Sequence, residues 1–422
     1  MSLAPSAHYD ALESRPPEQR EQALMAALPR VVAHARTNAP AFAKILEHVT
    51  PAAITTRDAL ASLPVTRKSE LLERQKAARP HGDPFGGFST IGWRPRRGAR
   101  RVFASPGPIY EPEGLADDYW RGARALYAAG FREGDLVHNS FSYHLTPAGS
   151  MMETAAHALG CTVFPGGVGN TELQVQAAAE LQPHGYIGTP SFLKILLEKA
   201  AERGIALASM RKAMLSGEAF PPSLRDWCAA RGVDGYQCYA TADVGLIAYE
   251  TVAREGLVLD EQVIVEIVRP GTGDPVPDGE VGEVVVTTLN PDYPLIRFGT
   301  GDLSAVLPGG CPTGRTNTRI RGWLGRADQT AKVRGMFVHP SQLADIAKRH
   351  PEVQRVRLVV SGEMANDRMT LRVEAAQRSD GLAERIAESL RDVTKLRGEV
   401  ELSEPGSLPN DGKVIEDARS YE

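Results

Sequence analysis

Three short segments in the second half of the chain carry residues that could do chemistry. Lys413 lies on a glycine-containing turn near the C-terminus, after a compact segment of mixed strand and helix. Upstream lie residues 293–302 and residues 325–328. A lysine held on such a turn could stabilise negative charge that develops on a reacting group. Taken alone, the lysine is better interpreted as a solvated turn residue, because so short a motif has little specificity.

Asp302 ends the first of the upstream segments. It follows a predicted strand and lies beside glycines. A buried aspartate there can accept two hydrogen bonds from a ribose diol, and its charge makes them stronger than neutral ones. An aspartate that caps the next segment explains the residue about equally well.

Ser216, Gly217 and Glu218 end another predicted strand, just before a helix that begins at proline. Open α/β sheets bind ligands at this kind of position. The glycine would let a flat base approach the backbone closely. Read alone, the segment is an ordinary strand-to-helix turn.

Residues 236–243 combine an aromatic ring, a hydroxyl and a carboxylate. Tyr239 could stack on adenine, and Thr241 could hydrogen-bond a phosphate. Asp243 could help to hold Mg²⁺, which prefers hard oxygen ligands. The simpler alternative is a strand with a helix cap at its end.

Residues 141–149 follow a predicted strand and mix apolar with polar side chains, as the lining of a small-molecule pocket does. They include Tyr143, His144 and Leu145. His144 could be a base, although a lone histidine is more often structural.

Five arginines between residues 94 and 101 form a dense basic run. Nucleic-acid binding is one interpretation, a solvated loop is the favoured one, and a clamp on nucleotide or CoA phosphates lies between them. The net charge of −4 argues against nucleic acid as a partner.

The composition is that of an ordinary globular protein, with 422 residues, 42% hydrophobic and 24% charged. Its four cysteines show no paired spacing, which argues against a disulfide framework and a structural zinc site. The sequence shows neither a secretory signal nor an apolar run of about 18 residues. We therefore expect a reduced cytoplasmic protein without a membrane span.

The pattern of elements predicts an α/β fold with more than one domain. Residues 1–80 are predicted as helices broken by prolines such as Pro29, and residues 81–114 as irregular. Residues 117–129 are predicted as one helix. From there to residue 215 short apolar strands alternate with helices, which predicts a mainly parallel sheet covered on both faces. A β-rich, antiparallel subdomain is expected from about residue 258, and an α+β unit of about 95 residues after residue 328.

Together these segments resemble the phenylacetate–CoA ligase family of adenylate-forming enzymes. The resemblance covers residues 103–413 and is densest over residues 119–193. It implies a large N-terminal domain, residues 1–327, and a small mobile C-terminal domain, residues 328–422, which carries Lys413. It also implies two half-reactions. A carboxylate attacks the α-phosphate of ATP, assisted by Mg²⁺, and CoA then displaces AMP from the acyl-AMP.

The resemblance assigns the nucleotide side of the site residue by residue. Lys413 matches the adenylation lysine, and Asp302 matches the ribose-binding aspartate. Tyr239, Thr241 and Asp243 are assigned to a Tyr-Gly-x-Ser/Thr-Glu motif, in which Ala240 here replaces the glycine, Thr241 stands one position before the Ser/Thr site and Asp243 is one methylene shorter than glutamate.

The hinge and the acid pocket follow from the same resemblance. Arg326 and Asp328 match the hinge motif. Lys332 and Gly335 lie in the loop that swings in for thioester formation. The acid pocket falls on residues 143–145 together with Phe164, and the implied substrate is a small aromatic or related carboxylic acid.

One segment departs from the family. Relatives carry a phosphate loop of the form SSGTTG, but this chain has the sequence ASPGPIYEP over residues 104–112, so Ser105 to Pro112 replace it. Prolines remove backbone donors, and we expect Glu111 to repel a triphosphate, so the loop should bind phosphate poorly. Activity is still expected, because Lys413, Mg²⁺ and arginines can meet the charge of the transition state. The cysteines that many relatives carry near Cys311 are also missing, so no metal site is expected there.

Three functions remain open from sequence. The first is an acid–CoA ligase, for which a homodimer is compatible. The second is a transferase that passes acyl-AMP to another acceptor, such as a carrier-protein thiol or an amine. The third is a binding or regulatory protein that kept the fold and lost adenylation, which the altered loop favours and the retained Lys413, Asp302 and Arg326 oppose.

Overall fold

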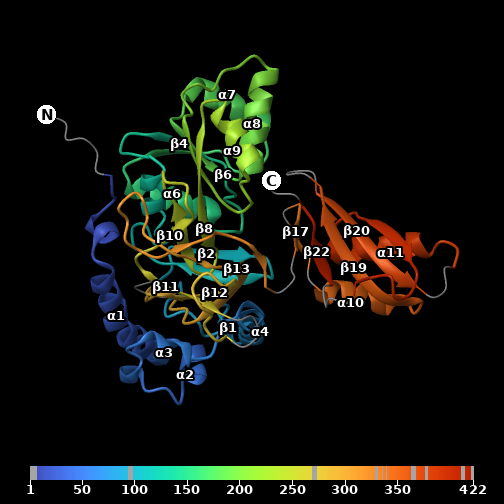
Figure 1. Ribbon diagram of the computed structural model, residues 1–422, viewed down its shortest axis with the longest axis horizontal. Helices are drawn as coiled ribbons and strands as arrows, with labels where there is room; N and C mark the ends of the chain where they lie inside the picture. Colours follow the sequence, from blue (N-terminus) through green and yellow to red (C-terminus); the bar gives the residue numbers. More distant parts are fainter. Residues whose placement is uncertain are drawn as a thin grey trace. The chain divides into compact units, whose positions relative to one another are not determined.

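The computed structural model describes residues 7–93, 98–268, 273–327, 331–334, 336–338, 340–362, 367–375, 379–409 and 414–419. The chain divides into two compact units, Met1–Gly325 and Arg326–Glu422 (Figure 1). Each unit is described by itself below. Within the described ranges, no helix is both long enough and apolar enough to cross a membrane.

The chain begins with a short 3₁₀ turn (Ala11–Ser14) and a group of helices: α1 (Pro17–Asn38), α2 (Pro40–Ile45), α3 (Arg57–Ala61) and α4 (Lys68–Ala78). The prediction that Pro29 breaks the first helix is wrong, since Pro29 lies inside α1. The helix continues because Leu24, Leu28 and Val32 share its buried face. Burying that face offsets the hydrogen bond that proline removes.

A nine-stranded sheet forms the centre of the first unit. Its strands run in the order β14-β15-β10-β9-β8-β7-β6-β4-β5. The parallel part consists of β4 (Leu136–Asn139), β5 (Thr162–Pro165), β6 (Gly185–Gly188), β7 (Lys212–Leu215) and β8 (Asp234–Thr241). The helices between these strands are α6 (Ala148–Ala158), α7 (Thr171–Leu181), α8 (Pro190–Glu202) and α9 (Pro222–Ala229). The predicted alternation of strand and helix is confirmed.

The helix predicted over residues 117–129 is shorter than expected. Helix α5 spans Ala123–Ala128 only. Asp118 and Arg121 have φ values of 48° and 65°. Residues other than glycine rarely adopt this left-handed backbone region, and a right-handed helix cannot contain it. The Asp118 carboxylate accepts hydrogen bonds from the backbone N–H of Ala123 at 3.1 and 3.2 Å, so it closes the loop just ahead of the helix.

The other half of the sheet is antiparallel and contains β9 (Gly245–Glu250), β10 (Leu257–Leu259), β15 (Arg319–Ile320) and β14 (Val306–Leu307). A separate sheet joins β11 (Val263–Val268), β12 (Gly282–Thr288), β13 (Phe298–Ser304) and β1 (Thr66–Arg67). The predicted β-rich region therefore exists, but β10 belongs to the central sheet.

Residues 101–113 were expected to be irregular and instead form a β-hairpin. Strand β2 (Arg101–Ser105) pairs with β3 (Ile109–Glu113) in antiparallel register. The hairpin is fixed to α4 by the Gln75 side chain, which bonds the backbone N–H and C=O of Tyr110, both at 2.8 Å. A side-chain amide supplied by another element holds the strand, which explains why no local pattern predicted it.

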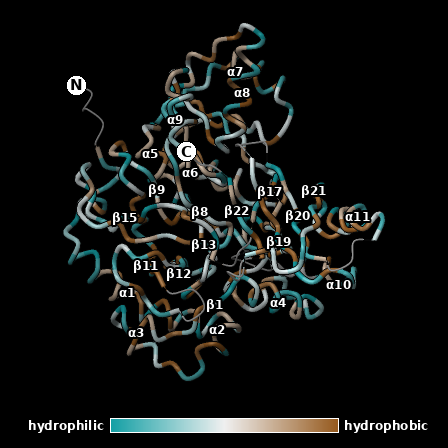
Figure 2. Tube along the Cα trace, turned by 45° about the vertical axis from the view of Figure 1, so that its right-hand side comes forward, coloured by the Kyte–Doolittle hydropathy of each residue, from teal (hydrophilic) through white to brown (hydrophobic). Residues whose placement is uncertain are grey.

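The second unit contains the hairpin β17 (Ala331–Val333) and β18 (Met336–Val338), and a four-stranded sheet. The sheet has the order β21 (Glu399–Ser403), β20 (Arg368–Ala375), β19 (Val353–Ser361) and β22 (Ile415–Asp417). Helices α10 (Pro340–Arg349) and α11 (Leu382–Thr394) pack against it. Along α11 hydrophobic and hydrophilic residues alternate in Figure 2, as expected where Leu382, Ile386 and Leu390 are buried. This α+β unit agrees with the predicted pattern.

Candidate active site

The predicted site residues of the first unit lie mostly where parallel strands end. Residues 141–149 follow β4, Phe164 is in β5, Ser216–Glu218 follow β7, and Thr241 ends β8, with Asp243 just beyond it. The carboxyl ends of parallel strands meet at one edge of a sheet, where α/β proteins bind ligands. The topology therefore gathers these separate segments at a single edge.

The residues predicted to form the acid pocket differ in burial. The Tyr143 hydroxyl accepts a hydrogen bond from the Asn139 side chain at 2.8 Å, and burial, with Glu153 next in effect, raises the pKa of Tyr143 above its usual value. His144 is exposed, and Leu145 is 75% exposed with φ 63°. Of the three residues in this segment, Tyr143 is the one whose side chain the fold holds in place.

Phe164 packs against a histidine that the sequence did not single out. Its ring lies 5.1 Å from the fully buried ring of His138, and His138 Nε2 is 2.7 Å from Gln174 Oε1. Burial lowers the pKa of His138, so this ring is a neutral wall. The Gln174 amide nitrogen also donates to the carbonyls of Gly166, Gly167 and Gly169, which fixes the loop after β5.

Two polar side chains of the segment after β7 bond the backbone of neighbouring segments. Ser216 Oγ donates to the Cys238 carbonyl at 2.9 Å, and Glu218 Oε2 accepts from the backbone N–H of Ser191 at 3.3 Å. Gly217 has φ +80°, and a Cβ there would come no nearer than 3.9 Å to Phe141 and Thr189. Glycine is needed for the backbone conformation, and space remains beside it.

Tyr239 and Asp302 come from different sheets and meet. The Tyr239 hydroxyl donates to Asp302 Oδ2 at 2.8 Å, and it lies 3.1 Å from Thr300 Oγ1. Trp323, which the sequence analysis missed, donates from Nε1 to Asp302 Oδ1 at 3.1 Å. Asp302 is 8% exposed, so its carboxylate is held in one orientation. Ala240, which follows Tyr239 in β8, lies at a register shift in the pairing of β8 with β9.

Asp243 lies beyond Tyr239, in the turn between β8 and β9. Thr241 Oγ1 accepts from the backbone N–H of Val244 at 3.2 Å, which tightens this turn. Asp243 is 4% exposed, and its Oδ2 lies 2.9 Å from Lys68 Nζ. Lys68 was also missed. It is the first residue of α4, where the helix dipole disfavours a cation, and that conflict is the sequence signal that could have pointed to it.

The rewritten loop brings Glu111 into the same region. Glu111 is fully buried, and Ser105 Oγ donates to its Oε1 at 2.5 Å. Burial raises the pKa of Glu111 to about 8, the charge of Asp243 adds to this, and Lys68 opposes it. The expectation that Glu111 repels a triphosphate assumed an ionised, exposed carboxylate. Burial raises the pKa of this one, which weakens the expected repulsion.

Two arginines of the basic run, Arg100 and Arg101, are engaged beside the hairpin. Arg101 Nη1 pairs with Glu113 Oε1 at 2.6 Å, and Arg100 donates to the Leu115 carbonyl at 2.8 Å. The remaining arginines of the run, at residues 94, 96 and 97, lie outside the described residues.

Lys413, Asp328 and Gly335 also lie outside the described residues. In the second unit, Arg326 and Lys332 approach the same ring: the guanidinium carbon lies 6.0 Å and the ammonium 5.9 Å from the centroid of Phe337. These contacts place the two cations together in the segment predicted to contain the hinge and the thioester loop.

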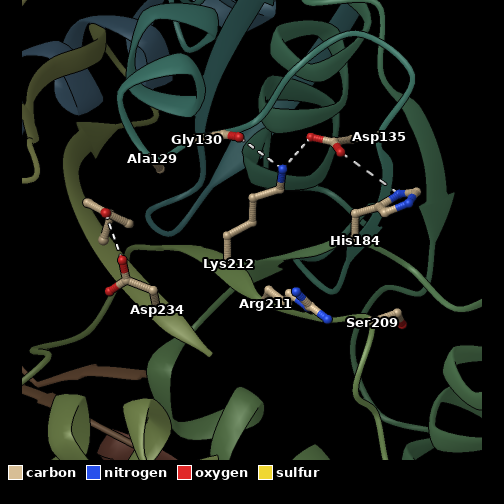
Figure 3. Close-up of a pocket in the computed structure, with 9 residues that line it drawn as sticks. Ala129, Gly130, Asp135, His184, Ser209, Arg211, Lys212 and Asp234 are labelled. Atoms are coloured by element: carbon tan, nitrogen blue, oxygen red, sulfur yellow. Dashed lines mark hydrogen bonds and ion pairs between the residues drawn. The ribbon is translucent and has the colours of Figure 1, made fainter. Parts of the chain in front are cut away.

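A depression at the opposite edge of the sheet has a structural explanation. It is lined by residues such as Asp135, His184 and Lys212 (Figure 3), which lie where β4, β6 and β7 begin. Lys212 Nζ is fixed there by Asp135 Oδ2 at 2.6 Å and by the Gly130 carbonyl at 2.9 Å. Lys212 therefore connects the start of β7 with the segment just before β4, across the intervening β6.

Comparison with known proteins agrees with this geometry. The AMP-binding enzyme family matches residues 120–290, and the AMP-binding enzyme C-terminal domain matches residues 335–417. The phenylacetate-coenzyme A ligase of Thermus thermophilus is 30% identical, over 94% of this chain and 95% of its own. That of Aromatoleum evansii is also 30% identical, over 89% and 88%.

A solved structure is similar over nearly the whole chain. A crystal structure of 2-hydroxyisobutyryl-CoA ligase in complex with 2-HIB-AMP and CoA has a TM-score of 0.81 at 26% identity, covering 99% of this chain and 94% of its own. The fold and the site define an adenylate-forming enzyme. The chain belongs to the phenylacetate–CoA ligase family of these enzymes, which are acid–thiol ligases that form AMP. The resemblance and the fold class predicted from sequence are confirmed.

Proposed function

We propose that the protein activates an aromatic or related carboxylic acid with ATP and transfers the acyl group to CoA. The observation that carries the proposal is the arrangement along β8 and the turn after it. Tyr239 meets the ribose-binding candidate Asp302, and farther along Asp243 meets Lys68. Asp302 would thus accept hydrogen bonds from the ribose diol, and Asp243 would bind the cation that accompanies the phosphates. These are the two groups of a nucleotide that such a site has to bind.

In the first step an oxygen of the substrate carboxylate attacks the α-phosphorus of ATP. The new P–O bond replaces the bond to the β-phosphate, and pyrophosphate leaves with the electron pair. In the second step the CoA sulfur, having lost its proton, attacks the acyl carbon, the C–S bond forms, and AMP leaves. Catalysis of such steps rests on positioning and on stabilising charge.

The residues present fit a magnesium ion at Asp243. Its Oδ1 is buried and accepts no hydrogen bond from the described residues, and a hard carboxylate oxygen is the ligand that Mg²⁺ prefers. Bound there, Mg²⁺ would neutralise phosphate charge. Lys68 orients the carboxylate from its other oxygen.

The remaining roles are part of the same proposal. Lys413 would stabilise the reacting carboxylate and phosphate in the first step, on a mobile domain of residues 328–422 that pairs with the domain of residues 1–327. Arg326 and Asp328 would form the hinge, and Lys332 and Gly335 the thioester loop. Gly217 and its neighbours Ser216 and Glu218 would bind the nucleotide base. From the resemblance we further propose a homodimer located in the cytoplasm.

The aromatic substrate is supported by the rings near the ends of β4 and β5. Tyr143 and Phe164, with His138 behind Phe164, give flat surfaces on which an aryl group can pack. The relatives in sequence are named as ligases of phenylacetate. The structural neighbour is named for 2-hydroxyisobutyrate, and an aliphatic hydroxy acid is therefore the contrasting substrate in the test.

The test measures pyrophosphate and AMP over a panel of aryl and 2-hydroxy acids, with and without CoA. Aryl-acid turnover that requires CoA is the expected result. Pyrophosphate exchange without transfer to CoA would favour another acceptor, and the absence of any ATP-dependent signal would favour a binding homologue. Turnover of hydroxy acids alone would reject the aromatic assignment and keep the ligase.

A further inference from the structure

Two carboxylates from distant segments are buried inside the first unit. Glu111 is on β3 and Asp243 is in the turn after β8, and they are 0% and 4% exposed. Each has one oxygen engaged: Glu111 Oε1 by Ser105 Oγ at 2.5 Å, and Asp243 Oδ2 by Lys68 Nζ at 2.9 Å. Their other oxygens, Glu111 Oε2 and Asp243 Oδ1, are buried and accept no hydrogen bond from any residue that the structure describes.

Helix α4 connects the segments that carry the two carboxylates. Its Lys68 lies 2.9 Å from Asp243, and its Gln75 holds Tyr110, which precedes Glu111 on β3. The charge of Asp243 contributes to the raised pKa of Glu111. Tyr293 is 1% exposed, and burial, together with the charges of Glu111 and Asp243, raises its pKa. Lys68 from α4 pairs with Asp243, and its charge opposes the rise in the pKa of Glu111. This ion pair thus engages one oxygen of Asp243 and leaves Glu111 Oε2 and Asp243 Oδ1 without a hydrogen bond from the described residues.

Such an arrangement needs a further positive charge or a proton. A buried carboxylate oxygen without a partner is costly, and a group of this kind in a folded protein calls for an explanation such as an ion. Mg²⁺ is commonly bound by one or two carboxylates plus substrate phosphates. A cage made of protein alone is therefore unnecessary, in keeping with the described residues, which contain no cluster of three or more His, Cys, Asp or Glu suited to a metal.

We propose that Glu111 is a second protein ligand of the Mg²⁺ ion that accompanies ATP, acting together with Asp243. The inference rests on the proposed function. It gives the rewritten hairpin a role: where relatives offer hydroxyls to phosphate, this chain offers a carboxylate to the metal. The shorter side chain of Asp243 is consistent with it, because a second ligand from β3 can compensate for its reduced reach.

The test measures the affinity of the protein for Mn²⁺ in the presence of α,β-methylene-ATP. The electron paramagnetic resonance signal of the free ion reports how much Mn²⁺ is unbound. Wild type is compared with Glu111→Gln, which keeps the shape and removes the charge. We expect metal affinity to fall by roughly tenfold or more, since even residues that only support ligands change it by that factor.

Glu113→Gln is the matched control. Glu113 lies on the same strand and is equally buried, but both its oxygens are engaged, by Arg101 at 2.6 Å and by Trp120 Nε1 at 3.3 Å. Its substitution should leave Mn²⁺ affinity within about twofold of wild type, because it removes no metal ligand. Thermal melting checks that both variants fold.

Equal Mn²⁺ affinity in wild type and Glu111→Gln would overturn the inference. The wild-type Glu111 would then hold a proton that it shares with Asp243 and would not bind the metal, so the neutral amide of glutamine could replace it without effect. Absence of nucleotide-dependent Mn²⁺ binding to wild type would overturn it too. If the variant does not fold, crystals of wild type with Mn²⁺ and the analogue decide: an anomalous peak beside Asp243 but away from Glu111 refutes it. Acid-dependent AMP release by wild type judges the proposed function separately.

Discussion

Asp302→Asn isolates the charge of the candidate ribose acceptor while keeping its shape. Asp302 accepts from Tyr239 and from Trp323. An indole N–H can only donate, whereas a tyrosine hydroxyl can also accept. An asparagine can therefore turn its Oδ1 toward Trp323 and its amide nitrogen toward Tyr239, and the fold should tolerate the substitution.

The effect on ATP follows from the change in hydrogen-bond strength. A bond to a charged group contributes about 1.5–3 kcal/mol and a neutral one about 1 kcal/mol. Losing the charge on two ribose bonds therefore costs about 2 kcal/mol, which is roughly 30-fold in affinity. We expect the KM for ATP to rise by about that factor, with a smaller change in kcat, since the bonds exist before and during the reaction.

Deoxynucleotides test whether the Asp302 carboxylate binds the ribose hydroxyl groups of ATP, because each of them lacks one of these hydroxyls. In a pyrophosphate-release assay, wild type should discriminate strongly against 2′-deoxy-ATP and 3′-deoxy-ATP, and Asp302→Asn should discriminate much less. Asp278→Asn, an exposed aspartate in a turn, is the control and should behave as wild type. An unchanged KM in Asp302→Asn, or equal discrimination by both proteins, would refute the role of Asp302.

Three further predictions concern the catalytic lysine, the core and pH. Lys413→Ala should abolish formation of acyl-AMP yet leave thioester formation from supplied acyl-AMP largely intact. The control is Lys348→Ala, at an exposed position on α10, which should affect neither step. Equal loss of both steps in Lys413→Ala would refute the role of Lys413. Leu28→Ala removes a fully buried side chain from α1 and should lower the free energy of unfolding by about 2–5 kcal/mol in urea titrations; a negligible change would contradict the packing of that helix. Burial raises the pKa of Asp118 from 3.8 to about 7, so the native state binds more protons than the unfolded state between these values and stability falls as pH rises through this window. Asp118→Asn should therefore gain stability over wild type as pH increases from 4 to 7, measured as the difference between their melting curves at each pH; a constant difference would contradict the raised pKa.

The sequence predicted the elements whose pattern is local. Short apolar strands alternate with helices between residues 117 and 215. Such strands are buried on both faces of their sheet, and this is typical of a parallel sheet. The helix Pro340–Arg349 and the strands β19 and β20 were predicted for the same reason. Motif order supplied the family resemblance, which the comparisons confirmed.

Pro29 and the β2–β3 hairpin show where local rules failed. A proline normally interrupts a helix, but the buried face of α1 kept it continuous. The hairpin was missed because its position depends on Gln75, far away in the chain. Propensity is a weak prior that tertiary contacts override.

The pairings that define the candidate site were decided by tertiary structure alone. Lys68 meets Asp243 across 175 positions of sequence, and Tyr239 meets Asp302 across 63. No local pattern can encode such partners, because side-chain periodicity reports burial and leaves the neighbour unspecified. The same holds for the pKa of Glu111: the sequence supplied a carboxylate, and only its burial, together with the charge of Asp243, raised its pKa.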